Sequence, residues 1–157
     1  MDFSVKIDGL DKLAAKSQIV AKIAAEELAK ALYVSGKLVE KEAKQSILAG
    51  DKSGRMYHRG TVTHRASAPG EAPASDTGRL VNSVNTEVTG LEATVSAGSG
   101  AVKYAAMLEF GTVKIAARPF LFPALEKSKA FIRKRFDQAL DKTIDRATAA
   151  AMKSIGK

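Results

Sequence analysis

The feature that most constrains the fold is a helical apolar periodicity that runs from Leu10 to about Ala49. Leucine, isoleucine and valine recur there at steps near three, four and seven, with lysines and glutamates between them. At 1.5 Å per residue, such a helix would be on the order of 60 Å long, which exceeds the width of a compact domain of this size. The helix must therefore either kink, with Gly36 the expected weak point, or protrude from the domain.

A second long helix is predicted from Ala124 to about Ser154, with Pro123 in its first turn, where the missing N–H costs nothing. Its apolar stripe is expected at Leu125, Ile132, Phe136, Leu140, Ile144, Ala147 and Ala151. Five basic residues crowd the other faces of this helix: Lys127, Lys129, Arg133, Lys134 and Arg135. They either solvate an exposed helix or form an electrostatic lining near DNA, so they are candidate DNA-facing residues.

Short strands are predicted from period-two alternation of apolar residues. One strand is expected at residues 3–7, and two more, at 84–88 and 93–97, form a hairpin around the turn at Thr89–Gly90. Asp76 or Thr77 is expected to cap a turn at residues 78–80, and a short helix is expected at residues 102–110 with Gly111 as its stop.

The predicted fold class is α+β, as one domain over residues 1–157. A small antiparallel sheet of three to four strands is expected to pack with the long N-terminal helix and the long basic C-terminal helix. A chain of 157 residues with 45% hydrophobic content can bury one core but not two independent ones.

Between the first helix and the hairpin lies an apparently unstructured stretch, at about residues 51–77, that is rich in glycine, proline and serine. It carries five basic or imidazole side chains: Arg55, His58, Arg59, His64 and Arg65. Loops of this length in compact domains are either functional or disordered. We expect a flexible arm that orders against a neighbouring subunit; the alternative is an inert disordered insertion.

The sequence lacks the groups that catalysis or metal binding requires. The chain has no cysteine, and its two histidines share the loop without a carboxylate at helical spacing. Gly98–Ser99–Gly100 lacks the rest of a phosphate-binding loop, and no nucleophile-elbow pattern is present. The prediction is therefore a protein with no catalytic residue, no cofactor and no metal.

Glu109 and Arg118 stand out because both lie in otherwise apolar segments. A partly buried carboxylate is best satisfied by a bidentate guanidinium, so the two are expected to pair. The interpretation we favour is structural, with the pair bracing the short helix against the segment before the last helix. Contact with another subunit is the alternative.

The net charge of +8, from 25 Lys and Arg against 17 Asp and Glu, biases the protein toward polyanions without implying sequence-specific DNA recognition. No window approaches the roughly 18 apolar residues of a membrane span, and the first residues lack the basic and apolar segments of a signal peptide. We therefore expect a soluble protein that is made in the cytoplasm and makes no membrane contact.

The segment at residues 104–125, YAAMLEFGTVKIAARPFLFPAL, resembles the hallmark of a family of tailed-bacteriophage neck, tail-completion or head-tail joining proteins. The residues that carry the resemblance are Tyr104, Glu109, Phe110, Gly111, Thr112, Ala117, Arg118, Pro119, Phe120, Leu121 and Pro123. A second block is similar to the family at residues 64–73, HRASAPGEAP, followed by DTGRL at residues 76–80.

The resemblance implies a non-enzymatic structural subunit of a phage or prophage virion, located at the neck or head-proximal tail end. Such proteins act as homo-oligomeric rings, commonly sixfold, through which DNA passes, although the isolated subunit can be monomeric. The implied partners are other neck and tail proteins, with non-specific contact to genomic DNA. The expected contact residues are Arg55, His58, Arg59, His64, Arg65, Tyr104, Glu109, Phe110, Arg118 and Phe120.

Three alternatives remain open from the sequence. Within the same class, the chain could be the tail terminator that caps the tail tube. From another class, it could be a non-specific DNA-binding protein, which predicts steeply salt-dependent duplex binding. A hydrolase with an unrecognised site is the third alternative.

Overall fold

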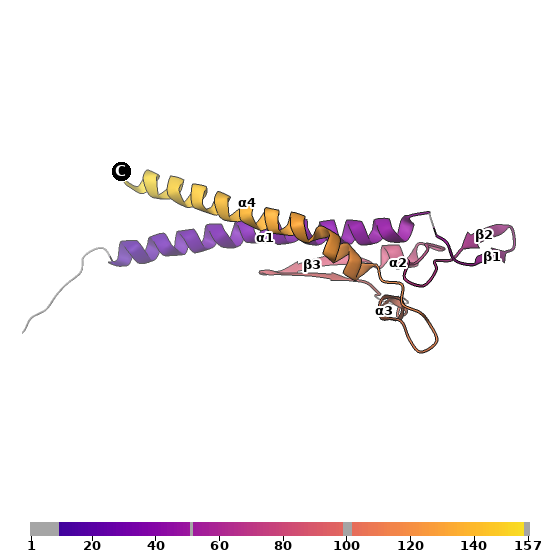
Figure 1. Ribbon diagram of the computed structural model, residues 1–157. Coiled ribbons are helices and arrows are strands. Elements are labelled where there is room, and N and C mark those ends of the chain that lie inside the picture. Colours follow the sequence, from indigo (N-terminus) through magenta and orange to yellow (C-terminus); the bar gives the residue numbers. More distant parts are fainter. Residues whose placement is uncertain (1–9, 51, 99–101, 156–157) are drawn as a thin grey trace, which may run out of the picture.

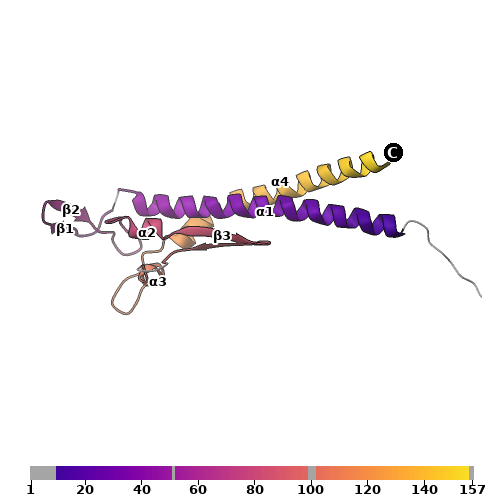
Figure 2. The same ribbon diagram turned by 180° about the vertical axis from the view of Figure 1, so that it is seen from behind.

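The computed structural model describes residues 10–50, 52–98 and 102–155, which form an elongated α+β molecule (Figure 1). Its elements are α1 (Leu10–Leu48), β1 (Met56–Arg59), β2 (Val62–Arg65), α2 (Arg79–Asn82), β3 (Asn85–Thr89), β4 (Glu92–Ser96), α3 (Ala105–Phe110) and α4 (Leu121–Ile155). The two long helices run antiparallel along the molecule and cross at a shallow angle (Figures 1 and 2). The predicted long helices and the α+β class are confirmed, and α1 protrudes beyond the small domain built around its C-terminal half.

The packing of α4 against the rest of the chain differs from the predicted apolar stripe. The buried positions of α4 are small: Ala124, Ser128, Ala139 and Thr143. Small side chains let two helix axes approach closely, which leaves no room for large ones at the contact. The prediction was therefore wrong for Leu140 and Ile144, which are 53% and 64% exposed, and for Leu125, which is also exposed.

Ion pairs between α1 and α4 join the two helices at both ends of their contact. Arg146 of α4 donates to Glu26 at 2.9 Å and to Glu27 at 2.6 Å, while Lys127 lies 2.6 Å from Glu42. Hydrogen bonds from Lys30 and then from Arg146 outweigh the effect of burial and lower the pKa of the Glu27 carboxyl below its ordinary value. These ion pairs fix the register of α4 along α1.

The strands form two separate two-stranded antiparallel sheets rather than one sheet of three to four strands. The predicted hairpin is confirmed as β3–β4, in which Thr86 is opposite Val95. The second hairpin, β1–β2, lies inside the segment that was expected to be one long loop. The strand expected at residues 3–7 lies outside the described residues.

The boundaries of the short elements also depart from the predictions. Helix α3 begins at Ala105 rather than at residue 102, and α4 begins at Leu121, three residues before the predicted start. The N-cap of α2 is Gly78, with a φ of 73°, rather than Asp76 or Thr77. The core gathers where α2, α3, the β3–β4 hairpin and the start of α4 meet the C-terminal half of α1. Its members are Val39, Ala43, Ile47, Leu80, Val81, Val84, Val102, Ala105, Phe120 and Ala124.

Gly36 does not kink α1, which continues without a break from Leu10 to Leu48. A Cβ atom on Gly36 would lie 2.5 Å from Cγ2 of Thr86, well inside van der Waals contact. The hydroxyl of Thr86 donates to Glu40 at 2.8 Å, which limits how far that side chain can rotate away. The glycine therefore provides the space in which the β3–β4 hairpin rests on α1.

We expect Gly36→Ala to destabilise the protein by about 1–2 kcal/mol, although alanine is favoured over glycine in a helix by about 1 kcal/mol. The cost comes from the clash with Thr86 Cγ2. In a Thr86→Ser background, which removes that methyl group and keeps the hydroxyl, the same substitution should be neutral or stabilising. Urea unfolding of the four variants measures this coupling; equal effects in both backgrounds would contradict the close-contact explanation.

Candidate interaction site

The carboxylate of Glu109 caps the last helix from a different element of the fold. Glu109 belongs to α3 and is 8% exposed. Its Oε2 accepts from the backbone N–H groups of Phe120 at 2.8 Å and Leu121 at 3.0 Å, and its Oε1 accepts from Phe122 at 2.8 Å. The N–H groups at the start of a helix have no hydrogen-bond partner within the helix, and the positive end of the helix dipole lies there. A carboxylate at this place accepts hydrogen bonds from these N–H groups and also interacts favourably with the dipole. This cap explains why α4 begins at Leu121.

Arg118 does not pair with Glu109, contrary to the prediction, because backbone N–H groups occupy both oxygens of that carboxylate. The guanidinium Nε of Arg118 donates instead to the carbonyl of Ser67 at 3.2 Å. Its backbone N–H donates to the carbonyl of Leu108 at 2.6 Å. The expected brace between α3 and the segment before α4 is therefore present, but two independent sets of contacts make it.

The two blocks that carry the resemblance meet in space although they are separated in the sequence. The N–H of Gly70 donates to the carbonyl of Ala117 at 2.9 Å, next to the contact between Arg118 and Ser67. Residues 64–80 and 104–125 are thus joined by hydrogen bonds. These residues form one structural junction between α1, α3 and α4.

The loop between α3 and α4 is held in a tight turn that exposes an apolar side chain. Gly111 has a φ of 75°, and a Cβ atom there would lie 2.9 Å from the backbone nitrogen of Ala117. The N–H of Thr112 donates to the carbonyl of Ile115 at 2.7 Å. Val113 at the tip is fully exposed.

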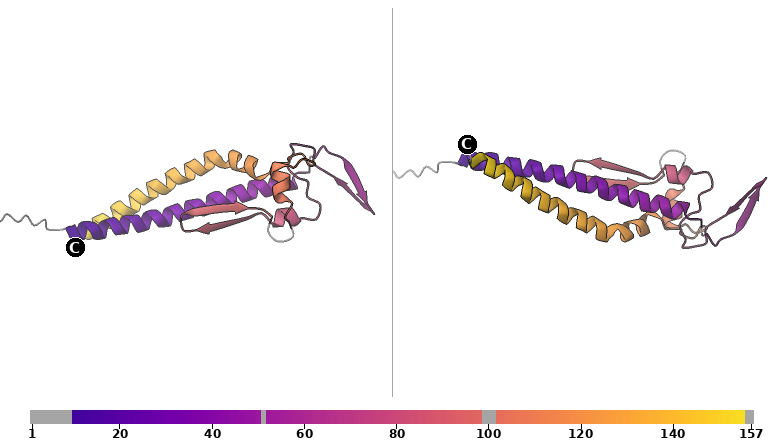
Figure 3. Two further views of the ribbon diagram at one scale, coloured as in Figure 1. Left: turned by 90° about the horizontal axis from the view of Figure 1, so that it is seen from below. Right: turned by 90° about the horizontal axis from the view of Figure 1, so that it is seen from above.

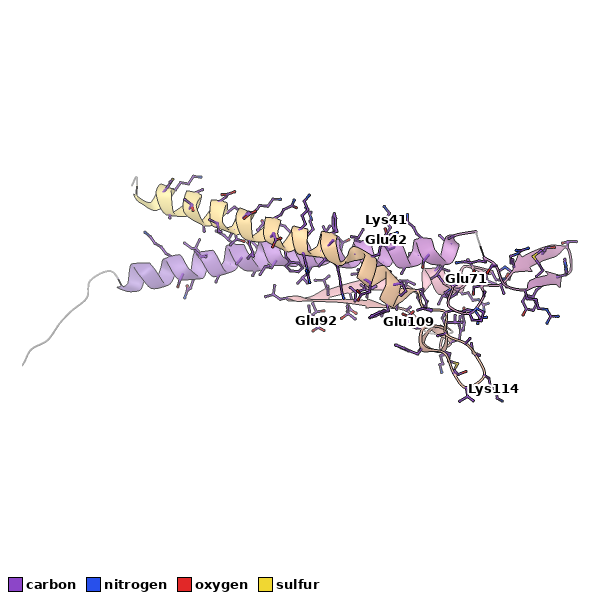
Figure 4. All side chains as sticks on the ribbon, in the orientation of Figure 1. Lys41, Glu42, Glu71, Glu92, Glu109 and Lys114 are labelled. Atoms are coloured by element: carbon purple, nitrogen blue, oxygen red, sulfur yellow. The ribbon has the colours of Figure 1, made fainter. Side chains whose placement is uncertain are left out.

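Glu71 fastens the segment that carries the β1–β2 hairpin (Figure 4). The hydroxyl of Ser53 and the N–H groups of Ala68 and Ser53 donate to its carboxylate. These hydrogen bonds, the Ser53 hydroxyl first, lower the pKa of Glu71 to about 2. Because Ser53 and Ala68 flank the hairpin, the ionised carboxylate ties the two ends of the arm together.

We name β1–β2 together with Arg55 the basic hairpin. It extends beyond the C-terminal end of α1, away from the packed body (Figures 1 and 3). Residues 52–70 contain one lysine and three arginines but no aspartate or glutamate. Several of the predicted contact residues lie here, with Arg55, His58 and Arg65 exposed and His64 half-buried; the backbone of Arg59 ends β1. The guanidinium of Arg55 stacks 5.7 Å from the ring centroid of Tyr57.

An apolar groove lies between α1, β4, α3 and the start of α4, with a volume of about 540 Å³. Its walls include Leu32, Val39, Val95, Phe110, Leu125 and Phe136. Phe110 on its rim is 81% exposed, and Phe122 beside it is also exposed. Contiguous exposed apolar surface of this kind is typical of interaction sites and ligand-binding grooves.

Two other predicted contact residues are internal or at the edge of the junction. Phe120 is 1% exposed and belongs to the core. Glu109 is occupied as the helix cap, and both residues also line the apolar groove. Tyr104 is the N-cap residue of α3 and is exposed.

The five basic residues of α4 do not share one face. Lys127 pairs with Glu42 of α1, whereas Lys129 pairs with Glu126 of its own helix at 2.5 Å. Successive helical residues are 100° apart, so these two lysines point in nearly opposite directions. Arg133 and Lys134 are exposed, and Arg135 donates to Gln138 at 3.2 Å. In the described chain, the basic hairpin is the more concentrated positive surface.

The two histidines of the chain lie on opposite faces of the basic hairpin. His64 pairs with Tyr57 across the hairpin and shares its face, whereas His58 pairs with Thr63 and lies on the other face. The His58 ring contacts the Thr63 hydroxyl at 3.1 Å. The two imidazoles therefore cannot converge on one ion. Within the described ranges, no group of three or more histidines, aspartates or glutamates could hold a metal ion. No helix in that part of the chain is long and apolar enough to cross a membrane.

Sequence reasoning missed the Glu71 clamp, the β1–β2 hairpin and the apolar groove. The hairpin had a local signal, because Gly60, with a φ of 60°, is the first residue of a two-residue turn, as is Gly90 in β3–β4. The clamp and the groove had none, because both are made by residues that are distant in the sequence.

Comparison with models of known protein families, with curated proteins and with solved structures found no match to this chain.

Proposed function

We propose that the chain is a non-enzymatic structural subunit of a phage or prophage virion, a neck or tail-completion protein that works in a ring at the head-tail junction. The observation that carries the proposal is the junction in which the two resembling blocks meet. The polar groups of these blocks make structural hydrogen bonds. Glu109 caps α4, Arg118 donates to the Ser67 carbonyl, and the Gly70 N–H donates to the Ala117 carbonyl. Contacts of this kind favour a structural role for these residues over a catalytic one.

The shape of the molecule also suits a ring subunit. A closed ring requires two different surfaces on each subunit, so that one subunit contacts the next in a head-to-tail manner. The basic hairpin, which lies at one end of the molecule (Figure 1), and the apolar groove on the body are two such unlike surfaces. Both have exposed apolar side chains, among them Tyr57 and Phe110.

The proposal is tested by measuring the mass of the purified chain and its effect on tail tubes. Light scattering after size-exclusion chromatography gives the mass over a range of concentrations. Negative-stain images are then taken after mixing with tubes from the phage or prophage that encodes the chain. Rings, or density on one tube end, are the expected result. A chain that neither forms rings nor attaches to tubes would contradict the proposal, and density that stops further tube growth would indicate the tail terminator instead.

Non-specific DNA binding is the second candidate, and the basic hairpin is the observation that favours it. The arm between Lys52 and Gly70 carries lysine and arginine but no carboxylate, and such positive charge suits contact with the backbone of duplex DNA. This candidate predicts that the monomer binds duplexes of unrelated sequence equally, with affinity that falls steeply as salt rises. Fluorescence anisotropy at several salt concentrations measures both; weak binding with a shallow salt dependence would leave the structural role as the better explanation.

A further inference from the structure

The basic hairpin has apolar side chains but no core of its own. Met56, Tyr57 and Val62 are exposed, although a two-stranded hairpin in isolation is at best marginally stable. The register places Tyr57 and Val62 on one face, and Met56 and Arg65 on the other. The face of Tyr57 and Val62 also holds the register positions of Arg59 and His64, and the other face carries the exposed guanidinium of Arg65.

The β3–β4 hairpin has the complementary character. Between Arg79 and Lys103 the sequence contains no lysine or arginine, and its two charged residues are Glu87 and Glu92. Both glutamates are exposed, and Glu92 lies on β4 near the tip of the hairpin (Figure 4). The two hairpins of this chain therefore carry charge of opposite sign.

Strand β4 offers a free edge beside the apolar groove. In the described part of the chain, β4 pairs with β3 alone, so the backbone groups of its other edge have no strand next to them. Ala93 and Val95 of β4 line the groove, whereas Glu92 and Thr94 alternate to the outer face. An exposed edge of this kind is a template for an additional strand.

We propose that the basic hairpin of one copy adds a strand to the free edge of β4 in a second copy. The added strand continues the sheet, so Tyr57 and Val62 lie over the apolar groove while Arg65 lies beside Glu92 on the outer face. The two hairpins of one chain point in opposite directions along the molecule (Figures 1 and 3), so a chain does not close this contact on itself. The contact joins unlike surfaces, and in this respect the inference rests on the proposed function of a ring subunit.

Cysteine cross-linking tests the placement directly, because the chain has no cysteine of its own. Thr63 of β2 and Thr94 of β4 are both exposed on the outer faces of their hairpins. Mixing Thr63→Cys with Thr94→Cys under mild oxidation should give the mixed dimer at least tenfold more than mixing Thr63→Cys with Thr148→Cys, an equally exposed control at the far end of α4. Equal yields at the highest attainable concentration would overturn the proposal.

Charge exchange provides the second test. Arg65→Glu and Glu92→Lys should each weaken self-association about tenfold. Self-association should be restored by the double variant in one chain, and also by an equimolar mixture of the two single variants, because alternating copies then place opposite charges at every contact. Lys153→Glu, an exposed change of equal charge on α4, should have no effect. If Arg65→Glu weakens only duplex DNA binding and leaves self-association unchanged, the hairpin contacts DNA and the proposal fails.

These experiments separate the inference from the proposed function. Self-association through the two hairpins without attachment to tail tubes would overturn the virion role and leave the contact standing. If the Arg65→Glu variant attached to tubes as intact rings, the hairpin contact would be overturned and the virion role would stand. The cross-linked pair, imaged on tubes, reports on both.

Discussion

Replacing Glu109 with alanine is expected to lower the free energy of unfolding by about 3 kcal/mol, because it removes three charge-assisted hydrogen bonds at a buried helix start. The N–H groups of Phe120, Leu121 and Phe122 would lose their acceptor, and the hydrogen bond of Phe120 is buried. For a domain of this size, that corresponds to a fall in Tm of about 6–12 °C. Thermal unfolding followed by circular dichroism measures the change.

Two further variants make the test of the Glu109 cap specific. Glu109→Gln keeps one acceptor oxygen but places an NH₂ group against helix N–H donors, so it should fall between the wild type and Glu109→Ala. Glu126→Gln removes an exposed carboxylate from the first turns of the same helix and should change stability by less than about 0.5 kcal/mol. If Glu126→Gln were as damaging as Glu109→Ala, general helix electrostatics rather than the cap would explain the result.

The long helices were predictable because their periodicity is local and extends over many turns. What the periodicity did not show is which side of α4 meets α1. The usual expectation places Leu140 and Ile144 inside, but alanine, serine and threonine allow a closer approach, and those residues form the contact. Leu140 and Ile144 therefore lie on the surface, and a periodic sequence pattern cannot distinguish such exposed apolar residues from core residues.

The junction was predictable only in part, for a similar reason. The unusual placement of Glu109 and Arg118 in apolar segments was visible in the sequence, and both residues do hold α3 and α4 together. Their partners are backbone groups, however, and backbone groups have no signature in a sequence. Pairing two charged side chains was the simplest assumption, and here it was wrong.

Glu40 illustrates a buried carboxylate whose partners are also distributed over two elements. It lies on α1, accepts from the Thr86 hydroxyl at 2.8 Å, and is flanked by Lys37 at 2.8 Å and Lys44 at 2.6 Å. Burial raises the pKa of this carboxyl, but the hydrogen bonds from the two lysines and from Thr86 together outweigh that effect and lower it to about 2. The ionised form therefore fastens the β3–β4 hairpin to the helix.

A carboxyl whose pKa is lowered on folding stabilises the folded state above its ordinary pKa and loses that contribution as the pH falls toward the folded value. For Glu40 the window runs from about pH 5 down to about pH 2. Because both lysines are partly exposed, we expect a contribution of about 2 kcal/mol after solvent screening, less than the full pKa difference would give.

The stability difference between the wild type and Glu40→Gln should therefore be about 2 kcal/mol at pH 7 and shrink as the pH falls through that window. Urea unfolding at a series of pH values measures this difference, and subtracting the variant cancels the contribution of Glu71, whose pKa is also lowered. Thr86→Ser keeps the hydroxyl donor and should preserve the pH dependence, whereas Thr86→Val should narrow the window. A difference that stays constant from pH 7 to pH 2 would mean that the Glu40 carboxylate is not what holds the hairpin to α1.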